Sequence, residues 1–523
     1  MKTDYEYLVL GGGPAGLQLA YYLERDGRDY QVLEAGSGAG TFFETLPRRG
    51  LLISINKVYT GTDDPELNLR HDWNSLLTDD HSHLFKEYSK EYFPKTDALV
   101  EYLNDFVSKF DLKIRHDTRV ATIRRTDAGY ELQTEDGITF SCRRLIVAAG
   151  VSKPYVPAIP GIELAEQYES VSVDPADFVN ERVLIIGKGN SAFETADTLI
   201  PSASVIHLVS PCPIDFAWKT HFVGDLRAIN NNLLDTYQLK SQNAVLDAET
   251  RQIRKRSDGS FAVTFEYKHA EGEVEELIYD RVICCTGFRF DASIFDESAK
   301  PELAVFDKFP SLTCEWESTN CDDMFFVGTL MQMRDYKKTN SGFIHGFRYN
   351  IEAFSKMLGE RFHDEPWQST EIPFDSSVIT ERLFSRINGS SALWQQQSFL
   401  GDCLVVKDDE TVEYYEGMPV AYLQRHSVDQ DKRCFVLTLE FGTMDQDVDP
   451  FRVNRIRKDN VEKAASSTFL HPAIREYQFG AKVSEHHVIE DLEAVWQEPE
   501  HINPLMKYFE QCIHSTDNHV AWE

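Results

Sequence analysis

The chain has 523 residues, which is enough for several domains. Its net charge of −32 argues against binding to nucleic acid or to anionic membrane surfaces, and no apolar run approaches the ~20 residues of a membrane helix. Nine cysteines without a CxxC motif indicate a reducing compartment. Neither a signal peptide nor a retention signal is recognised, so we expect a cytoplasmic protein with no membrane partner.

A strand–turn–helix–strand unit opens the chain. The apolar run Tyr5–Leu10 leads directly into Gly11-x-Gly13-x-x-Gly16, and a second short strand ends in Glu34 about 20 residues later. In this pattern the glycines allow a tight turn, a close approach to a pyrophosphate and close packing of helix on strand, while the acid accepts ribose hydroxyls. The predicted contacts to the dinucleotide are Gly11, Gly13, Pro14, Ala15, Gly16 and Glu34.

Two loop segments follow the second strand. Gly36–Phe43 is a glycine-rich turn, and its position after the ribose acid favours a loop that covers the cofactor through Thr41 and Phe42. Residues 51–77 have few helix signals but many aromatic and apolar side chains, which argues against disorder. We interpret this segment as lining an active site; the alternative is a structural loop.

A core helix and several strands complete the first unit. Apolar residues at a spacing of three or four predict a helix over Thr96–Phe110. Short strand-like runs follow, and Leu145–Gly150 is a buried strand that ends at a glycine. The proline-rich stretch Lys153–Gly161 is typical of a linker.

A second dinucleotide unit begins at Arg182. It repeats the strand, the glycine turn and the helix, with Ala192 in place of the third glycine. The next strand ends in Ser210 instead of an acid, which favours NADPH, with NADH as the alternative, because a carboxylate would repel a 2′-phosphate. The predicted contacts to this second dinucleotide are Gly187, Gly189, Asn190, Ser191 and Ser210.

Two further glycine-ended strands and a helix follow. Tyr279–Gly287 contains adjacent Cys284 and Cys285, which we interpret as buried packing residues because neighbours on a strand point to opposite faces. Met324–Gly328 precedes a helix that extends to about Leu358. His345 lies at the start of this helix and is either a site residue or a core histidine.

The composition changes after about residue 362, where the glycine motifs end. We expect strands at Cys403–Lys407, Pro419–Leu423 and Cys434–Leu439 and a helix at Val488–Val495, hence an α+β accessory domain. His486 and His487 lack the spacing of a metal site, so no metal is expected.

Two dinucleotide units, each paired with a glycine-ended strand, predict a flavoprotein with two nucleotide cofactors. The predicted fold class is α/β, with two Rossmann-like domains, one inserted in the other. FAD occupies the first, with additional contacts at Val120, Gly150 and Gly328, and NAD(P)H occupies the second. The expected ranges are 1–162 and 286–362 for the FAD domain, 163–285 for the NAD(P)H domain and 363–523 for the accessory domain.

Several motifs resemble those of the flavin-containing monooxygenases. Gly40-Thr41-Phe42 looks like the family's Gly-Thr-Trp, and Gly187-x-Gly189-x-Ser191-Ala192 looks like its nicotinamide motif. The family signature departs at Tyr168–Phe178, where the spacing is kept but its Gly and His are not. A closer resemblance is to the flavoproteins of endoplasmic-reticulum-associated degradation. It is carried by runs such as LISINKVYTG and SGFIHGFRYN, and it extends over nearly the whole chain.

The resemblance implies an FAD monooxygenase in which NAD(P)H reduces the flavin and O₂ reacts at flavin C4a to form a hydroperoxide. Asn56 would then protect the hydroperoxyflavin, and Lys57, Arg70 and His345 would bind a substrate carboxylate or the flavin. The partners would be O₂ and a small molecule with a reactive nitrogen or sulfur, in a monomer or a homodimer. Two alternatives stay open: a reductase or oxidase without oxygen insertion, and a flavin-holding protein-interaction factor.

Overall fold

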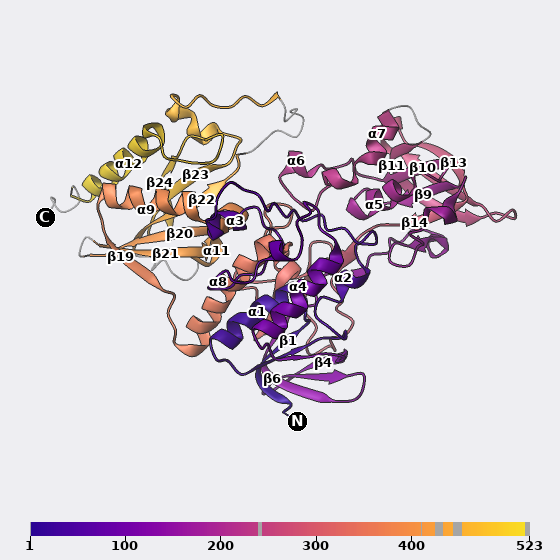
Figure 1. Cartoon of the computed structure of the whole chain (residues 1–523), viewed down its shortest axis with the longest axis horizontal. Helices are drawn as coiled ribbons and strands as arrows, with labels where there is room; N and C mark the ends of the chain where they lie inside the picture. The colour runs from indigo at the N-terminus through magenta and orange to yellow at the C-terminus, as the bar shows by residue number, and fades with distance from the viewer. Residues whose placement is uncertain (1, 239–242, 409–410, 424–431, 443–451, 518–523) are drawn as a thin grey trace.

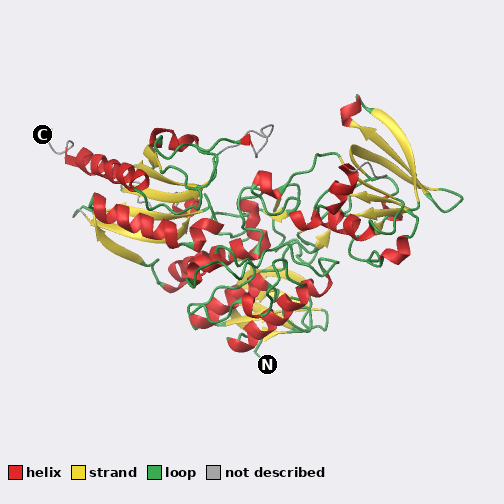
Figure 2. Ribbon diagram, turned by 45° about the horizontal axis from the view of Figure 1, so that its top comes forward, coloured by secondary structure: helices red, strands yellow, loops and turns green. Residues whose placement is uncertain are grey.

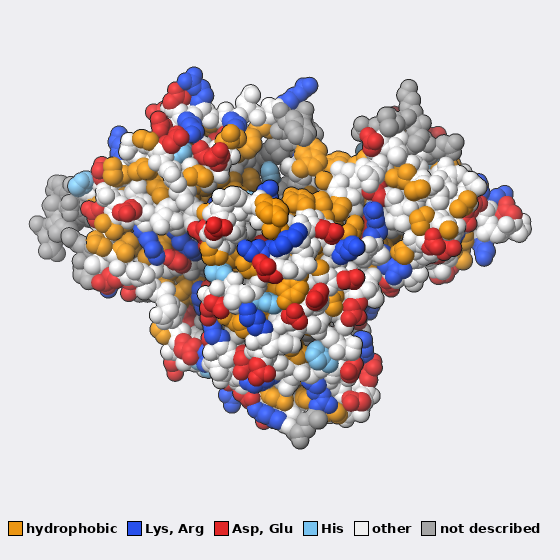
Figure 3. All heavy atoms as spheres, viewed as in Figure 1, with side chains coloured by type: hydrophobic (Ala, Val, Ile, Leu, Met, Phe, Trp, Pro, Cys, Tyr) orange, Lys and Arg blue, Asp and Glu red, His pale blue; other side chains and the backbone are white. Residues whose placement is uncertain are grey.

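The computed structural model describes the chain apart from residues 1, 239–242, 409–410, 424–431, 443–451 and 518–523. Figure 1 shows three lobes, with the lobe that carries the N-terminus placed between and below the other two. Within the described part of the chain, no helix is long and apolar enough to cross a lipid bilayer. On the face drawn in Figure 3, acidic and basic side chains are interspersed.

The lobe that carries the N-terminus is built on a seven-stranded sheet with the order β3-β2-β1-β6-β5-β4, and β18 pairs with β6. The pairs of β1 with β2 and β6, of β2 with β3 and of β6 with β18 are parallel. Helix α1 packs against α4 and α8. The bounds are β1 Asp4–Leu10, α1 Pro14–Arg25, β2 Tyr30–Leu33, α4 Thr96–Lys109, β3 Ile114–Arg115, β4 Val120–Thr126, β5 Gly129–Thr134, β6 Thr139–Val147, β18 Met324–Phe326 and α8 Ile344–His363.

The second lobe contains another seven-stranded sheet, with the order β13-β12-β11-β10-β9-β14-β8. Its parallel core of β9, β10 and β14 is apolar on both faces, as expected for strands covered from two sides. The bounds are β8 Glu166–Gln167, β9 Arg182–Ile186, α5 Asn190–Leu199, β10 Val205–Ser210, α6 Ala217–Thr220, α7 Asn232–Gln238, β11 Ala244–Lys255, β12 Phe261–Tyr267, β13 Glu273–Tyr279 and β14 Arg281–Cys284.

The C-terminal lobe contains a six-stranded antiparallel sheet with the order β19-β21-β20-β22-β23-β24. Helices α9 and α12 contact each other beside this sheet, as Figures 1 and 2 show. The bounds are β19 Ser369–Pro373, α9 Ser376–Gly389, α10 Ser391–Gln395, β20 Leu400–Val406, β21 Thr411–Pro419, α11 Val420–Tyr422, β22 Arg433–Glu440, β23 His471–Gln478, β24 Ala481–His487 and α12 Pro499–Asp517.

The remaining elements are short. Strand β7 pairs with β15 between the first two sheets, and β16 pairs with β17. The bounds of the remaining elements are α2 Phe42–Thr45, α3 Pro65–Leu69, η1 Phe85–Glu87, β7 Lys153–Pro154, η2 Ile162–Leu164, η3 Pro175–Phe178, η4 Ala228–Asn230, η5 Lys268–Ala270, β15 Phe288–Arg289, β16 Leu303–Ala304, β17 Phe309–Pro310, η6 Gly328–Arg334 and η9 Val461–Ser466.

The predicted fold class is confirmed: two α/β sheets with parallel cores are followed by an α+β domain. Two element predictions in the C-terminal lobe are wrong. Strand β21 ends at Pro419, because proline has no N–H to continue the ladder, and the short helix α11 follows. Residues 488–495 form a loop, because Asp491 accepts hydrogen bonds from the backbone N–H groups of Glu493 and Val495.

Candidate functional site

The first glycine turn is shaped by close packing on strand β6. Gly11 has a φ of +112°, and a Cβ there would lie 2.8 Å from the carbonyl oxygen of Ala148. A Cβ on Gly13 would meet no atom within 4 Å, so this residue opens onto free space. Gly13 is the N-cap of α1 and Pro14 is its first residue, which leaves backbone N–H groups at the helix end for an anion.

Glu34 is held at the edge of this turn by backbone donors. Its Oε2 accepts from Gly12 N at 2.6 Å, and its Oε1 accepts from Gly36 N at 2.7 Å and Thr41 Oγ1 at 3.1 Å. The carboxylate therefore fixes the glycine turn and the covering loop to each other.

A cavity of about 980 Å³ runs from the first glycine turn to the second lobe. Its walls combine the first lobe with residues of the second, so a ligand in it would touch both nucleotide units. Of the predicted site residues, those that line it are Gly11, Gly13, Pro14, Ala15, Glu34, Thr41, Phe42, Val120, Gly150, Asn190, Ser191 and His345.

One end of the cavity is aromatic and carries two polar groups. His345 stacks on Trp73, and Arg227 of the second lobe lies 5.0 Å from the same indole ring. His345 is buried, and neither of its ring nitrogens has a hydrogen-bond partner among the described residues. Burial, followed by the charges of Arg348 and Arg227, holds the pKa of His345 well below 6.5, so the imidazole is neutral.

The second lobe meets the first through a buried carboxyl group that lines the cavity. Glu194 accepts hydrogen bonds from Arg49 N and Tyr168 Oη, both at 2.6 Å. Burial raises the pKa of Glu194. Asn190 uses its side-chain oxygen to accept from Arg227 N at 3.0 Å, which fixes the loop that carries Arg227.

Three of the four predicted catalytic residues do not reach the cavity, and this corrects the prediction. Asn56 donates to the carbonyl oxygens of Ser89 and Glu91, at 2.8 and 3.3 Å, and is buried inside its own loop. Lys57 is exposed. Arg70 donates to the carbonyl groups of Ile387, Asn388 and Ser390 at the end of α9, where a cation satisfies free helix carbonyls.

Five predicted cofactor contacts also lie off the cavity wall. Gly16, Gly187 and Gly328 are packing positions, where an added Cβ would lie 1.9, 2.2 and 2.4 Å from Gly11 O, Cys285 O and Ala15 Cβ. Gly189 is the N-cap of α5, and the Ser210 hydroxyl donates to Cys212 O at 2.9 Å. The first three therefore shape the turns.

None of the residues that line the cavity is a cysteine. No disulfide bond joins any of the nine cysteines, all of which lie in the described part of the chain, and Cys284 and Cys285 are buried, as the sequence predicts. Burial raises the pKa of both thiols, which makes them poor nucleophiles. The cavity wall therefore carries no dithiol.

The sequence reasoning missed Tyr168, Glu194 and Arg227 and did not single out Trp73 as a site residue. Trp73 carried a weak signal, because it belongs to the aromatic loop that was expected to line the site. The others come from the second lobe and reach the cavity only through the arrangement of the lobes.

The chain is similar to a known protein family and to several known proteins. The family described as pyridine nucleotide-disulphide oxidoreductase matches residues 8–328. FAD-dependent oxidoreductase domain-containing protein 2 of Mus musculus is 38% identical over 98% of this chain and 84% of its own length. Senecionine N-oxygenase of Tyria jacobaeae is 27% identical over 67% of this chain and 73% of its own length. The resemblance stated from sequence motifs is thus confirmed.

Two solved structures share the fold over 69% of this chain. Bacillithiol disulfide reductase from Staphylococcus aureus has a TM-score of 0.53 and 19% identity, and covers 69% of this chain and all of its own. A flavin-containing monooxygenase from Stenotrophomonas maltophilia has a TM-score of 0.51 and 19% identity, and covers 69% of this chain and 99% of its own. At this identity they show the fold and leave the reaction open.

Proposed function

The chain belongs to the family of FAD-dependent oxidoreductase domain-containing protein 2, and we propose that it is an NADPH-dependent flavin monooxygenase that oxygenates a nitrogen or sulfur atom of a small molecule. Membership of this family shows that the chain is an FAD-dependent oxidoreductase. What we propose beyond the family is the use of NADPH and O₂ and the type of substrate. The geometry of the cavity supports this proposal.

The first lobe fits FAD on three observations. Gly13 opens onto free space, the N-terminal end of α1 offers backbone N–H groups, and the carboxylate of Glu34 is fixed at the cavity edge. The glycine turn would hold the pyrophosphate and Glu34 the ribose hydroxyls. Bound flavin supplies hydride acceptance and the reaction with O₂.

NADPH would bind on the second lobe at Asn190 and Ser191, which line the same cavity. Strand β10 ends in Ser210. A carboxylate at this position would repel the 2′-phosphate of NADPH, and serine does not. A shared cavity lets a nucleotide on one lobe face a flavin on the other.

The aromatic end of the cavity suits the oxygen acceptor. Trp73 and His345 exclude water, and the neutral imidazole offers one donor and one acceptor to a ligand. Within the described part of the chain Arg227 forms no ion pair, so its guanidinium is available to an anionic group of the substrate. Arg227 thus replaces Lys57 and Arg70 as the proposed anchor for a substrate carboxylate.

One observation carries the proposal: a single cavity reaches both nucleotide units and ends in a wall that has a neutral histidine and no cysteine. A dithiol reductase would need a thiol pair there, and the nearest pair, Cys284 and Cys285, is buried.

The test is a screen of amines and thioethers with the purified flavoprotein, NADPH and O₂. We expect substrate-dependent NADPH consumption coupled to a product that gains one oxygen atom. Stoichiometric hydrogen peroxide with every compound would favour an NADPH oxidase. A flavin that NADPH never bleaches under anaerobic conditions would exclude both enzymes and favour a protein-interaction factor in which FAD is structural.

For its location we propose the cytoplasm. The support is that no disulfide bond joins any of the nine cysteines, all of which lie in the described part of the chain, as is usual in a reducing compartment. Fractionation of cells that express the tagged chain would test this, and recovery from a membrane-enclosed compartment would contradict it.

A further inference from the structure

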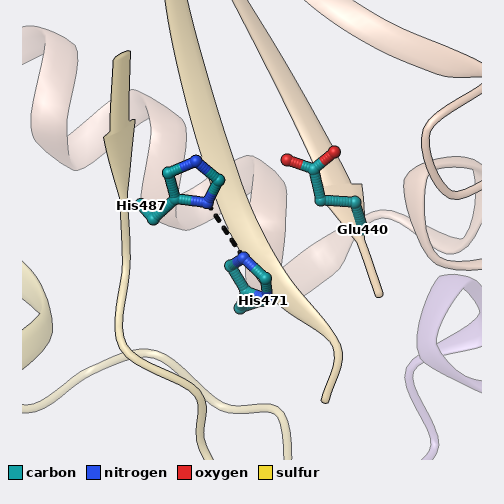
Figure 4. Close-up of side chains that lie close together, drawn as sticks. All are labelled: Glu440, His471 and His487. Atoms are coloured by element: carbon teal, nitrogen blue, oxygen red, sulfur yellow. Dashed lines mark hydrogen bonds between the residues drawn. The ribbon is translucent and has the colours of Figure 1, made fainter. Parts of the chain in front are cut away.

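Three potential metal ligands converge at one corner of the C-terminal sheet, away from the cavity (Figure 4). Glu440 is the last residue of β22, His471 is the first of β23 and His487 is the last of β24. The register places Glu440 opposite His471, and His487 opposite Ala473. Since residues two apart on a strand share a face, all three side chains lie on the same face of the sheet.

The ligand atoms are close enough to share one ion. One nitrogen of each histidine and one carboxylate oxygen of Glu440 lie within 4.8 Å of one another. His471 Nε2 is 2.9 Å from His487 Nδ1, and Figure 4 shows the two rings turned toward each other. In a tetrahedral zinc site with bonds of about 2.0–2.1 Å the ligand atoms are roughly 3.4 Å apart, so only small side-chain movements are required.

The hydrogen bonds around the cluster orient the lone pairs of His471 and Glu440 inward. His471 Nδ1 lies 2.8 Å from the carbonyl oxygen of Phe469, so this nitrogen must carry the proton and Nε2 carries the lone pair. A backbone carbonyl on the second nitrogen is the usual support of a metal-bound histidine. Arg475 donates to Glu440 Oε1 at 2.6 Å, which orients the carboxylate and leaves Oε2 for a cation.

We propose that Glu440, His471 and His487 bind a zinc ion. Two imidazole nitrogens and one carboxylate are a ligand set that zinc prefers, and three protein ligands leave a fourth position for water. To bind the ion, His487 Nδ1 must give up the hydrogen that it donates to His471. The ring then takes its other neutral tautomer, with the hydrogen on Nε2, which lies 3.9 Å from Glu485 Oε2. No protein group changes its oxidation state.

The position of the cluster suggests what the ion does. The next residue after Glu440 is Phe441, whose ring stacks on His221 of the second lobe, with centroids 4.1 Å apart and planes at 9°. A metal that ties the ends of β22, β23 and β24 together would therefore fix the segment through which the C-terminal domain touches the nucleotide-binding lobe.

The test uses the full-length flavoprotein, with zinc itself as the probe. The protein is treated with EDTA, loaded with Zn²⁺ and passed through a desalting column, and its metal content is counted by mass spectrometry. We expect one zinc per chain, with X-ray absorption showing two histidine nitrogens among nitrogen and oxygen ligands at about 2.0–2.1 Å. Glu440→Gln and His487→Gln should each lower the affinity at least about 100-fold in a chelator competition.

His514→Gln is the matched control, because this histidine is exposed on α12 of the same domain. It should bind zinc as the wild type does. The FAD content and circular dichroism of each variant report whether the chain is still folded. Wild-type protein that leaves the column without zinc overturns the proposal, and so do folded Glu440→Gln and His487→Gln variants that retain zinc as tightly as the wild type.

Discussion

The indole ring of Trp73 stacks on the imidazole of His345, with centroids 4.2 Å apart and ring planes at 21°. Trp73 comes from the segment between α3 and η1, whereas His345 lies in the first turn of α8. Arg227 of the second lobe lies 5.0 Å from the same indole. The aromatic end of the cavity is therefore complete only when the two lobes are arranged as they are here.

Removal of the Trp73 ring should weaken this arrangement. Aromatic and cation–π contacts of this kind contribute about 0.5–1.5 kcal/mol each, and two are lost, so Trp73→Ala should lower kcat/KM for the oxygenated substrate by roughly 5- to 150-fold. The measurement is product formed per NADPH consumed, together with the initial rate. Trp73→Phe should keep most of the activity because a ring remains. An unchanged kcat/KM in Trp73→Ala would contradict the prediction.

His345 should not contribute an ionisation to the pH profile near neutrality. Its pKa is well below the ordinary value of 6.5, first because it is buried and then because Arg348 and Arg227 are close. The ring loses its proton at a pH far below that range, and it is neutral from pH 6 to pH 8. The rate of flavin reduction by NADPH in His345→Gln should therefore show the same pH dependence as in wild type. An inflection near pH 6.5 that disappears in the variant would disprove this.

Arg227 should discriminate between charged and neutral substrates. A hydrogen bond to a charged group contributes about 1.5–3 kcal/mol, so Arg227→Ala should raise KM for a carboxylate-bearing substrate roughly 10- to 100-fold. The KM of the corresponding amide should change little. Arg227→Lys keeps the charge and should be intermediate, because lysine lacks the planar fork. If KM for NADPH rises instead, the guanidinium binds the nucleotide.

Gly13 and Gly11 separate cofactor binding from folding. Gly13→Ala places a methyl group where no atom lies within 4 Å, so the chain should fold but bind FAD roughly 5- to 100-fold more weakly, because the methyl occupies the pyrophosphate approach. Gly11→Ala should impair folding, since φ is +112° and the Cβ would lie 2.8 Å from Ala148 O. FAD retained after gel filtration measures binding, and circular dichroism of the same samples measures folding. Gly389→Ala, at an open position on α9, is the control and should retain FAD.

The sequence predicted those parts of the site that depend on local pattern. Gly11, Gly13 and Glu34 lie within one short strand–turn–helix–strand unit, so their spacing determines their geometry, and the structure places all three on the cavity wall. The same holds for Asn190 and Ser191 in the second unit.

The remainder depends on contacts that no local pattern encodes. The loop that contains Asn56 turns away from the cavity, where Asn56 pairs with Asp72, and it returns to the cavity wall at Trp73. The predicted residues between Asn56 and Asp72 therefore do not line the cavity. The zinc ligands proposed here come from three strands, and only His487 belongs to the pair that the sequence brought to notice. Such a site can be predicted only when the register of the sheet is known.

Asp335 makes the stability of the first lobe dependent on pH. Its side chain is buried after η6, and it accepts hydrogen bonds from Thr339 and Ser341, but its Oδ1 has no partner among the described residues. Burial raises the pKa of Asp335 from 3.8 to about 6. Because the folded state holds the proton more tightly than the unfolded state, this contribution to stability is complete below pH 3.8 and is lost as the pH rises through about 6.

The free energy of unfolding of the wild type should fall between pH 5 and pH 8 as Asp335 ionises. In Asp335→Asn this fall should be absent, because asparagine does not ionise. The difference between the two proteins should grow by roughly 1–2 kcal/mol over that interval, since about half of the effect of the pKa shift from 3.8 to about 6 falls within it. Urea unfolding followed by flavin fluorescence at both pH values measures this. Asp364→Asn, at the exposed end of α8, should follow the wild-type curve. If Asp335→Asn also runs parallel to the wild type, the carboxyl group is ionised in the folded protein and an unrecognised partner must satisfy it.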